Sequence, residues 1–323
     1  MLEAKEDKAF FRKIFPYLLL AIAIIAVSFS AIIVVKLLDR DVPAEITAMY
    51  RTLFAGIGAL ILSIRNKDYK WIGKKTTLRR SYWIILAGLL LAIHFATWFI
   101  SLDYVSVAIS TTLVDTVPIF LAIFGFLFFK EKVNIVGILG IIIAFGGGAL
   151  LAFASPGNNE IQSNLVLGIG FSLIGALTVT FYFLIGKKIL QDSPLWPYFA
   201  FVNLSSALFL FIYCLIKGYR IELFQYSAFV YLLFVIAALA PSLIGHATYN
   251  YSLRNLPAFI VGVVILGEPI GATILSVRML DQRPDLITIL YAGIILVGIV
   301  LTSLSQNLRI PIPCRKKIEE EPK

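Results

Sequence analysis

Long apolar runs, separated by short polar stretches, dominate the sequence. A helix rises about 1.5 Å per residue, so about 20 apolar residues cross the hydrocarbon core of a bilayer. Runs near this length occur at residues 14–35, 45–64, 82–102, 105–129, 133–154, 165–186, 195–216, 228–252, 256–277 and 286–305. We therefore expect an all-α integral membrane protein with ten transmembrane helices.

Composition agrees with this class. Of the 323 residues, 59% are hydrophobic and only 15% are charged, and the mean hydropathy is +0.91, well above that of a soluble domain. The net charge of +9 does not indicate a nucleic-acid partner, because the Lys and Arg residues lie between apolar runs and at the chain ends. Cys214 and Cys314 make no disulfide framework or metal site. We expect no metal and no cofactor.

Identical residues recur at one constant spacing between the two halves of the chain. Pro43 and Pro194 are separated by 194 − 43 = 151 positions. The same offset relates Lys36 to Lys187, Pro118 to Pro269 and Gly147 to Gly298. We interpret this as an internal duplication. Since each half holds five apolar runs, an odd number, the second copy must cross the membrane in the opposite sense, which predicts two inverted five-helix repeats.

The charged loops predict the topology. If the N-terminus is cytoplasmic, the inner tails and loops carry 21 Lys and Arg residues and the outer loops carry 6. Positive residues favour the inner side, so we expect both termini in the cytoplasm and the chain in the plasma membrane. The expected parts are a cytoplasmic tail (1–13), a first repeat (14–154), a linker (155–164), a second repeat (165–305) and a cytoplasmic tail (306–323).

Several motifs resemble a known family. The run His94–Ala108 is similar to spans three and four of EamA-type carriers of the drug/metabolite transporter superfamily, and Gly245–Leu253 with Leu266–Gly271 are similar in the second half. The resemblance covers nearly the whole chain. It implies ten helices in two inverted repeats around a central cavity, and transport of small polar metabolites such as amino acids, or of drugs. Two segments depart from the family pattern: Val27-Ser28 replaces a frequent Trp-Gly, and Leu280–Arg283 replaces a Gly-Glu-Arg turn.

Each half places an acid near a proline inside an apolar run. Glu268 lies near the middle of its run and directly precedes Pro269, while Asp115 stands three residues before Pro118. A charge at mid-membrane costs about 2.5 kcal/mol or more, and a proline frees backbone groups upstream. We therefore expect helix breaks there, with Glu268 and Asp115 as substrate-binding or coupling groups. The alternative for Glu268 is a hydrogen bond that serves packing alone.

Two further pairs of residues could line the cavity. His246 and Asn250 are four residues apart and share a helix face, as do His94 and Trp98. Both pairs are candidate substrate-binding or coupling residues. The alternative for His246 and Asn250 is an interhelical hydrogen bond, and for His94 and Trp98 it is packing. Arg51 is expected to extend its side chain to the outer headgroups, and the alternative is an ion pair with an acid.

Two functions remain open. The first is a secondary active transporter, an exporter that works by alternating access, with protons as the candidate coupling ion and a monomer or homodimer as the assembly. The segment Gly73–Thr76 cannot serve as an ATP-binding loop because Asp68 occupies its first glycine position and Lys75 its Ser/Thr position. The second is an intramembrane enzyme that uses His94, His246, Asp115 or Glu268. The sequence holds no His-Glu-x-x-His or Gly-x-Ser-x-Gly pattern, which favours the transporter.

Overall fold

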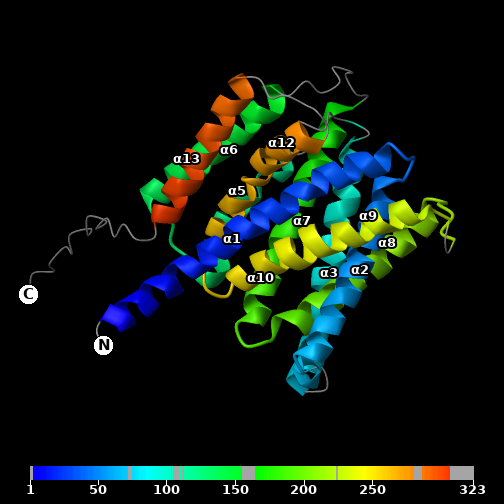
Figure 1. The fold of residues 1–323 in the computed structure, drawn as a ribbon, viewed down its shortest axis with the longest axis horizontal. Coiled ribbons are helices and arrows are strands. Elements are labelled where there is room, and N and C mark those ends of the chain that lie inside the picture. Colours follow the sequence, from blue (N-terminus) through cyan, green and yellow to red (C-terminus); the bar gives the residue numbers. More distant parts are fainter. Residues whose placement is uncertain are drawn as a thin grey trace, which may run out of the picture.

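The computed structural model describes residues 3–71, 75–102, 104, 110, 113–154, 164–222, 225–279 and 286–305. All regular elements in these parts are helices (Figure 1). The first half forms α1 (Glu3–Leu38), α2 (Ala44–Arg65), the short 3-10 helix η1 (Asp68–Trp71), α3 (Lys75–Leu102), α5 (Val117–Phe129) and α6 (Ile135–Ala154). The second half forms α7 (Leu165–Leu190), α8 (Leu195–Ile216), α9 (Ala228–Ala237), the π-helix η2 (Ala238–His246), α10 (Ala247–Ser252), α11 (Ala258–Ile265), α12 (Glu268–Met279) and α13 (Leu286–Ser305).

Seven helical segments in the described parts are long and apolar enough to cross a membrane. They are Phe15–Leu38, Ala44–Arg65, Leu78–Ser101, Val166–Leu190, Leu195–Ile216, Ala228–Ser252 and Ala258–Met279. The three other predicted runs each contain a shorter apolar helix in the described residues. Large apolar side chains such as Ile61, Ile142 and Val166 are exposed on the outside, where a bilayer would cover them. The protein is therefore a multi-pass membrane protein.

Local sequence sets several helix starts. Proline stands at the N-cap of α2, α8 and α11, where its fixed φ suits the turn and its missing N–H is not needed. Asn164 begins α7 by accepting a hydrogen bond from the backbone N–H of Leu167, and Ser227 does the same for Val230 in α9. The elements expected from the apolar runs thus begin at recognisable caps.

Helix boundaries repeat at the offset of the sequence matches. The counterparts Ala44 and Leu195 begin α2 and α8, and Arg65 and Ile216 end them. The offset also relates the bounds of α6 to those of α13, and the first residue of α5 to that of α12. The correspondence therefore extends from the sequence to the elements themselves.

The main helix interfaces join the two halves to each other. α2 packs on α8, α3 on α7, α5 on α11 and α6 on α13, while α1 lies along the continuous segment α9–η2–α10 (Figure 1). The pair α6 and α13 approaches closely because a Cβ atom added at Gly298 would collide with the backbone of Ala144. The halves are thus interleaved, and neither forms a core of its own.

The ninth apolar run is broken at its polar centre. α11 ends at Ile265 and α12 begins at Glu268. Between them the N–H groups of Leu266 and Gly267 bond to carbonyls three residues earlier, at 3.1 and 2.9 Å, instead of continuing the α-helical pattern. The helix is thus interrupted between α11 and α12, beside Pro269.

Some expectations fall at or beyond the limits of the described residues. Most of the linker 155–164 and all of the tail 306–323 lie outside them. At the other end, α1 begins at Glu3, so most of the segment predicted as an N-terminal tail is helical.

Candidate functional site

A buried arginine lies between several helices. The side chain of Arg51 on α2 is only 7% exposed. Its Nε donates to Ser242 Oγ at 2.9 Å and its Nη1 to Ser30 Oγ at 3.0 Å. The guanidinium also lies over the ring of Phe95, 5.4 Å from its centroid. The expectation that Arg51 reaches the headgroups is therefore wrong, because hydroxyls on η2 and α1 and an aromatic face on α3 hold it inside.

A π-helix presents one of these hydroxyls. Pro241 has no N–H for a regular helical bond, and η2 surrounds it with the wider turns of a π-helix. Ser242 Oγ donates to the carbonyl of Ala237, five residues earlier, at 3.3 Å while it accepts from Arg51. Segments of this kind are frequent at functional sites.

A small cavity adjoins the guanidinium. Its volume is about 10 Å³, close to the minimum that holds one water molecule. Side chains from α2, α3, α7, α8 and η2 line it. The polar ones are Arg51, Thr52, Tyr182, Asn203, Ser242 and His246. Polar groups of both halves thus meet at this point.

Both predicted acids face the interior. Glu268 interacts electrostatically with Arg51 and with Asp115, but neither acid forms an ion pair within 4 Å with a described residue. Both side chains are partly buried. Ser28 donates to the backbone carbonyl of Glu268 at 3.2 Å and to that of Ile24 at 2.7 Å. The departure at Val27-Ser28 therefore supports the broken helix.

His94 and Trp98, the candidate pair of the first half, are held by a hydrogen bond and by ring packing. His94 is buried, and its Nδ1 lies 3.0 Å from the carbonyl oxygen of Gly175, so Nδ1 carries the proton and donates. The rings of His94 and Trp98 are stacked with centroids 6.3 Å apart. The indole N–H of Trp98 is buried without a hydrogen-bond acceptor in the described parts of the chain.

The pair of the second half is divided between two surroundings. His246 lines the cavity beside Arg51. Asn250 is fully buried, and its amide donates to Tyr182 OH at 2.6 Å and to the carbonyl of His246 at 2.9 Å. Asn250 therefore makes the interhelical bond that was its alternative role, while His246 remains available to a ligand in the cavity.

The structure thus brings Glu268, Asp115, His94 and His246 into electrostatic reach of Arg51 or of one another. Sequence reasoning missed Tyr182 and Ser242 and placed Arg51 at the headgroups. One signal was present for Arg51. Every other Lys or Arg lies in a tail, in a loop or near the end of an apolar run, whereas Arg51 lies within one.

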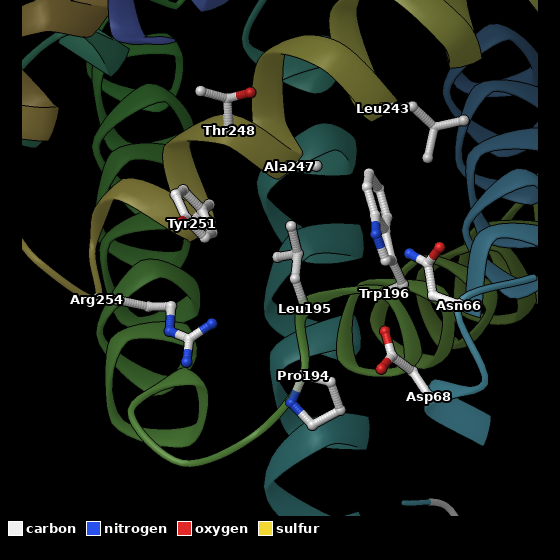
Figure 2. A pocket seen from close by; sticks show the side chains of 10 residues that line it. All are labelled: Asn66, Asp68, Pro194, Leu195, Trp196, Leu243, Ala247, Thr248, Tyr251 and Arg254. Atoms are coloured by element: carbon white, nitrogen blue, oxygen red, sulfur yellow. The ribbon is translucent and has the colours of Figure 1, made fainter. Parts of the chain in front are cut away.

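A larger pocket opens at one end of the bundle (Figure 2). It measures about 400 Å³ and lies between the end of α2, the start of α8 and the segment η2–α10. Asn66, Asp68 and Arg254 contribute polar groups, and Trp196 and Leu243 contribute apolar ones (Figure 2). Several alanines form an apolar cluster with Phe199 between α2, α8 and the segment η2–α10. Phe199 also lines the small cavity.

Two ion pairs join the halves at the same end. Lys187 Nζ lies 2.8 Å from Glu131 Oε1, with the two side chains 9% and 11% exposed. Arg80 binds Asp192 with two hydrogen bonds, at 2.6 and 2.8 Å. The Arg80 guanidinium holds the pKa of the Asp192 carboxyl below its usual value.

Among the described residues, no group of three or more His, Cys, Asp or Glu could hold a metal ion.

Comparison with known proteins identifies the class. A curated protein of Bacillus subtilis described as uncharacterized transporter YxxF is 26% identical over 251 residues, which cover 78% of this chain and 77% of that protein. An uncharacterized transporter of Archaeoglobus fulgidus is 23% identical over 73% of this chain and 83% of its own length. One from Synechocystis is 24% identical over 94% of this chain and 90% of its own length. The protein is a membrane transporter.

The family follows from the repeats. The EamA-like transporter family matches residues 14–153 and again residues 166–304, so the chain belongs to this family and carries its repeat twice. A solved crystal structure shares the fold with a TM-score of 0.76 at 16% identity, over 91% of this chain and 98% of the other. This family is part of the drug/metabolite transporter superfamily. Membership of it indicates a transporter and not the intramembrane enzyme.

Proposed function

We propose that the protein is a secondary active transporter in the plasma membrane that exports small polar metabolites, such as amino acids, or drugs. The observation that carries this proposal is the set of interior charges. Glu268 begins α12 and Asp115 stands two residues before α5, and Glu268 interacts electrostatically with both Arg51 and Asp115. Charged groups inside a membrane protein are costly and mark substrate or ion pathways.

The proposed mechanism is alternating access between two inverted repeats, residues 14–154 and 165–305. Equal helix boundaries at one offset and five apolar runs in each half support the inversion. Reciprocal packing supports it too. In the first pair, α3 of the first half packs on α7 of the second; the counterparts of these two elements, α9–η2–α10 and α1, also pack on each other. A twofold axis between the halves would produce such an exchange. The ten apolar helices would then cross the membrane ten times, with both termini in the cytoplasm.

Under this topology the 400 Å³ pocket opens to the cytoplasm. It is the proposed entrance for substrate, and the apolar cluster around Phe199 is the barrier between the entrance and the interior charges. The ion pairs Lys187–Glu131 and Arg80–Asp192 hold the same end together. Export would require this end to open and close as the two repeats rock.

Glu268 is the proposed coupling group. Its charged form loses hydration at mid-membrane, so it would be neutral in one part of the cycle and ionised when water, Arg51 or a cationic substrate group approaches. Asp115 and Tyr249 also interact with it and belong to the same electrostatic cluster. Protons are thus the proposed coupling ions.

The test is Glu268→Gln. A thermal-shift screen first identifies a substrate, and uptake into proteoliposomes then measures accumulation driven by a pH gradient. The variant should fold, because a neutral amide is cheaper to bury than a carboxylate, and should lose concentrative uptake while it retains exchange. Glu222→Gln, at an exposed position outside the helices, is the matched control. Normal pH-driven accumulation by Glu268→Gln would refute the coupling role and move it to Asp115 or His246.

A further inference from the structure

Lys187 and Arg51, two buried cations of the described residues, have different partners. Lys187 has a carboxylate partner, and its ammonium also donates to the carbonyls of Leu253 at 3.0 Å and Leu256 at 2.7 Å. Its charge is compensated and its three N–H groups have acceptors. Arg51 is buried at least as deeply, but its hydrogen bonds are to two neutral hydroxyls.

The guanidinium of Arg51 retains donors for a ligand. Arginine has five N–H groups, and the bonds to Ser242 and Ser30 use two of them. Within the described residues, no carboxylate lies within 4 Å. A buried charge without an ionic partner is strongly destabilising, so a purely structural arginine would be expected to have one, as Lys187 does. An arginine held in this state is suited to a bidentate bond with a carboxylate.

The surroundings restrict the ligand further. Ser30 and Ser242 orient the guanidinium from two helices, and the Phe95 ring covers one of its faces. Glu268 interacts electrostatically with Arg51 and with Asp115, so two carboxyl groups lie in the same interior. An ammonium group close to these carboxyls would favour their ionised forms and be attracted to them, whereas an anion with several charges would be repelled. One cation and two acids together match a molecule with one carboxylate and one amine.

We propose that Arg51 binds the carboxylate of the transported substrate, whose amine faces Glu268 and Asp115, so that the substrate is a small zwitterion and not a purely cationic drug. The inference rests on the proposed function and selects among its substrate classes. The cavity of about 10 Å³ holds no more than one water molecule, so the helices around it must part when the zwitterion binds.

The experiment measures binding to the purified full-length protein without any ion gradient. The probes are matched pairs, leucine with leucinamide and phenylalanine with phenylalaninamide, in which the amide keeps the amine and the side chain but lacks the carboxylate. Thermal stabilisation and tryptophan fluorescence titrations report affinity. Wild type should bind at least one acid about 30-fold or more tightly than its amide, because a buried charge pair is lost in the amide.

Arg51→Gln should remove this discrimination, and Arg51→Lys should retain only part of it because lysine cannot form the bidentate bond. Arg65→Gln, at the exposed end of the same helix, is the matched control and should keep the wild-type ratio. If Arg51→Gln does not fold, Ser242→Ala removes the acceptor of Nε, together with the hydroxyl's bond to the carbonyl of Ala237, and should reduce the ratio about 3- to 10-fold.

Three results would overturn the inference: equal binding of acid and amide by wild type, unchanged discrimination in Arg51→Gln, or no binding of either acid by wild type. Because no gradient is used, these outcomes are independent of the uptake test with Glu268→Gln. Acid-selective binding without pH-driven uptake would uphold the carboxylate site and refute the coupling mechanism. The reverse combination would uphold coupling and refute the site.

Discussion

The buried pair Lys187–Glu131 should contribute strongly to stability, because each partner also forms hydrogen bonds with the backbone at the end or the start of a helix. Lys187 donates to the carbonyls at the end of α10 and beyond it, and Glu131 Oε2 accepts from the N–H of Ala258, the first residue of α11, at 2.8 Å. The perturbation is a double-mutant cycle of Lys187→Met and Glu131→Met.

The magnitude follows from these contacts. Removing one partner leaves the other charge buried and unpaired, which costs about 3–5 kcal/mol. Independent effects would therefore sum to at least about 6 kcal/mol in the double variant. The double variant, however, leaves no buried charge and loses only the hydrogen bonds of one N–H and two carbonyls, at about 1 kcal/mol each. It should cost about 3 kcal/mol, so the coupling free energy should be about 3 kcal/mol or more.

Equilibrium unfolding of the purified protein in mixed detergent micelles measures the four free energies. The matched control is the cycle of the exposed pair Arg80 and Asp192, whose coupling should stay below about 1 kcal/mol because solvent screens it. Additivity of the Lys187 and Glu131 variants within about 0.5 kcal/mol would refute the reasoning. So would a single variant as stable as wild type.

Three further outcomes are expected. Arg80 lowers the pKa of Asp192, so the difference in unfolding free energy between wild type and Arg80→Gln should be present above the usual carboxyl pKa. The difference should vanish as pH falls through the lowered pKa of Asp192. A pH series of unfolding curves that shows a constant difference would contradict this expectation. Gly298→Ala should destabilise by about 1–3 kcal/mol because its Cβ meets the backbone of the facing helix, whereas Gly293→Ala on the same helix meets open space and should be neutral or stabilising in thermal unfolding. A cysteine at Asn66 should be shielded from an impermeant thiol reagent in intact cells, and its rapid labelling would place that turn outside.

Much of the fold could be predicted from the sequence. The apolar runs predicted the helices, since a segment that crosses lipid must satisfy its backbone internally and carry apolar side chains along its length. The constant offset predicted the repeated boundaries, and the proline after Glu268 predicted the break between α11 and α12. These features depend on local chemistry or on identity between positions, so they can be read without knowledge of the partners.

The candidate site could be predicted only in part. Glu268 and Asp115 were found because an acid in an apolar run is conspicuous. Arg51 was assigned to the headgroups because the sequence does not reveal its partners: Ser30 lies 21 residues away and Ser242 lies 191 residues away. His246 and Asn250 lie in the continuous segment η2–α10, but only the position of Tyr182 on α7 decides that Asn250 donates to that hydroxyl while His246 lines the cavity.

The sequence by itself determined the class of protein, the positions of its helices, the duplication and the presence of charges within the membrane region. Tertiary structure alone decided which of these charges meet. In a soluble helix a polar face distinguishes outside from inside, but lipid is as apolar as a protein core, so a membrane helix is apolar all round and its periodicity does not show which face turns inward. The packing of α2 between helices of both halves turned Arg51 inward, towards the hydroxyls of η2 and α1.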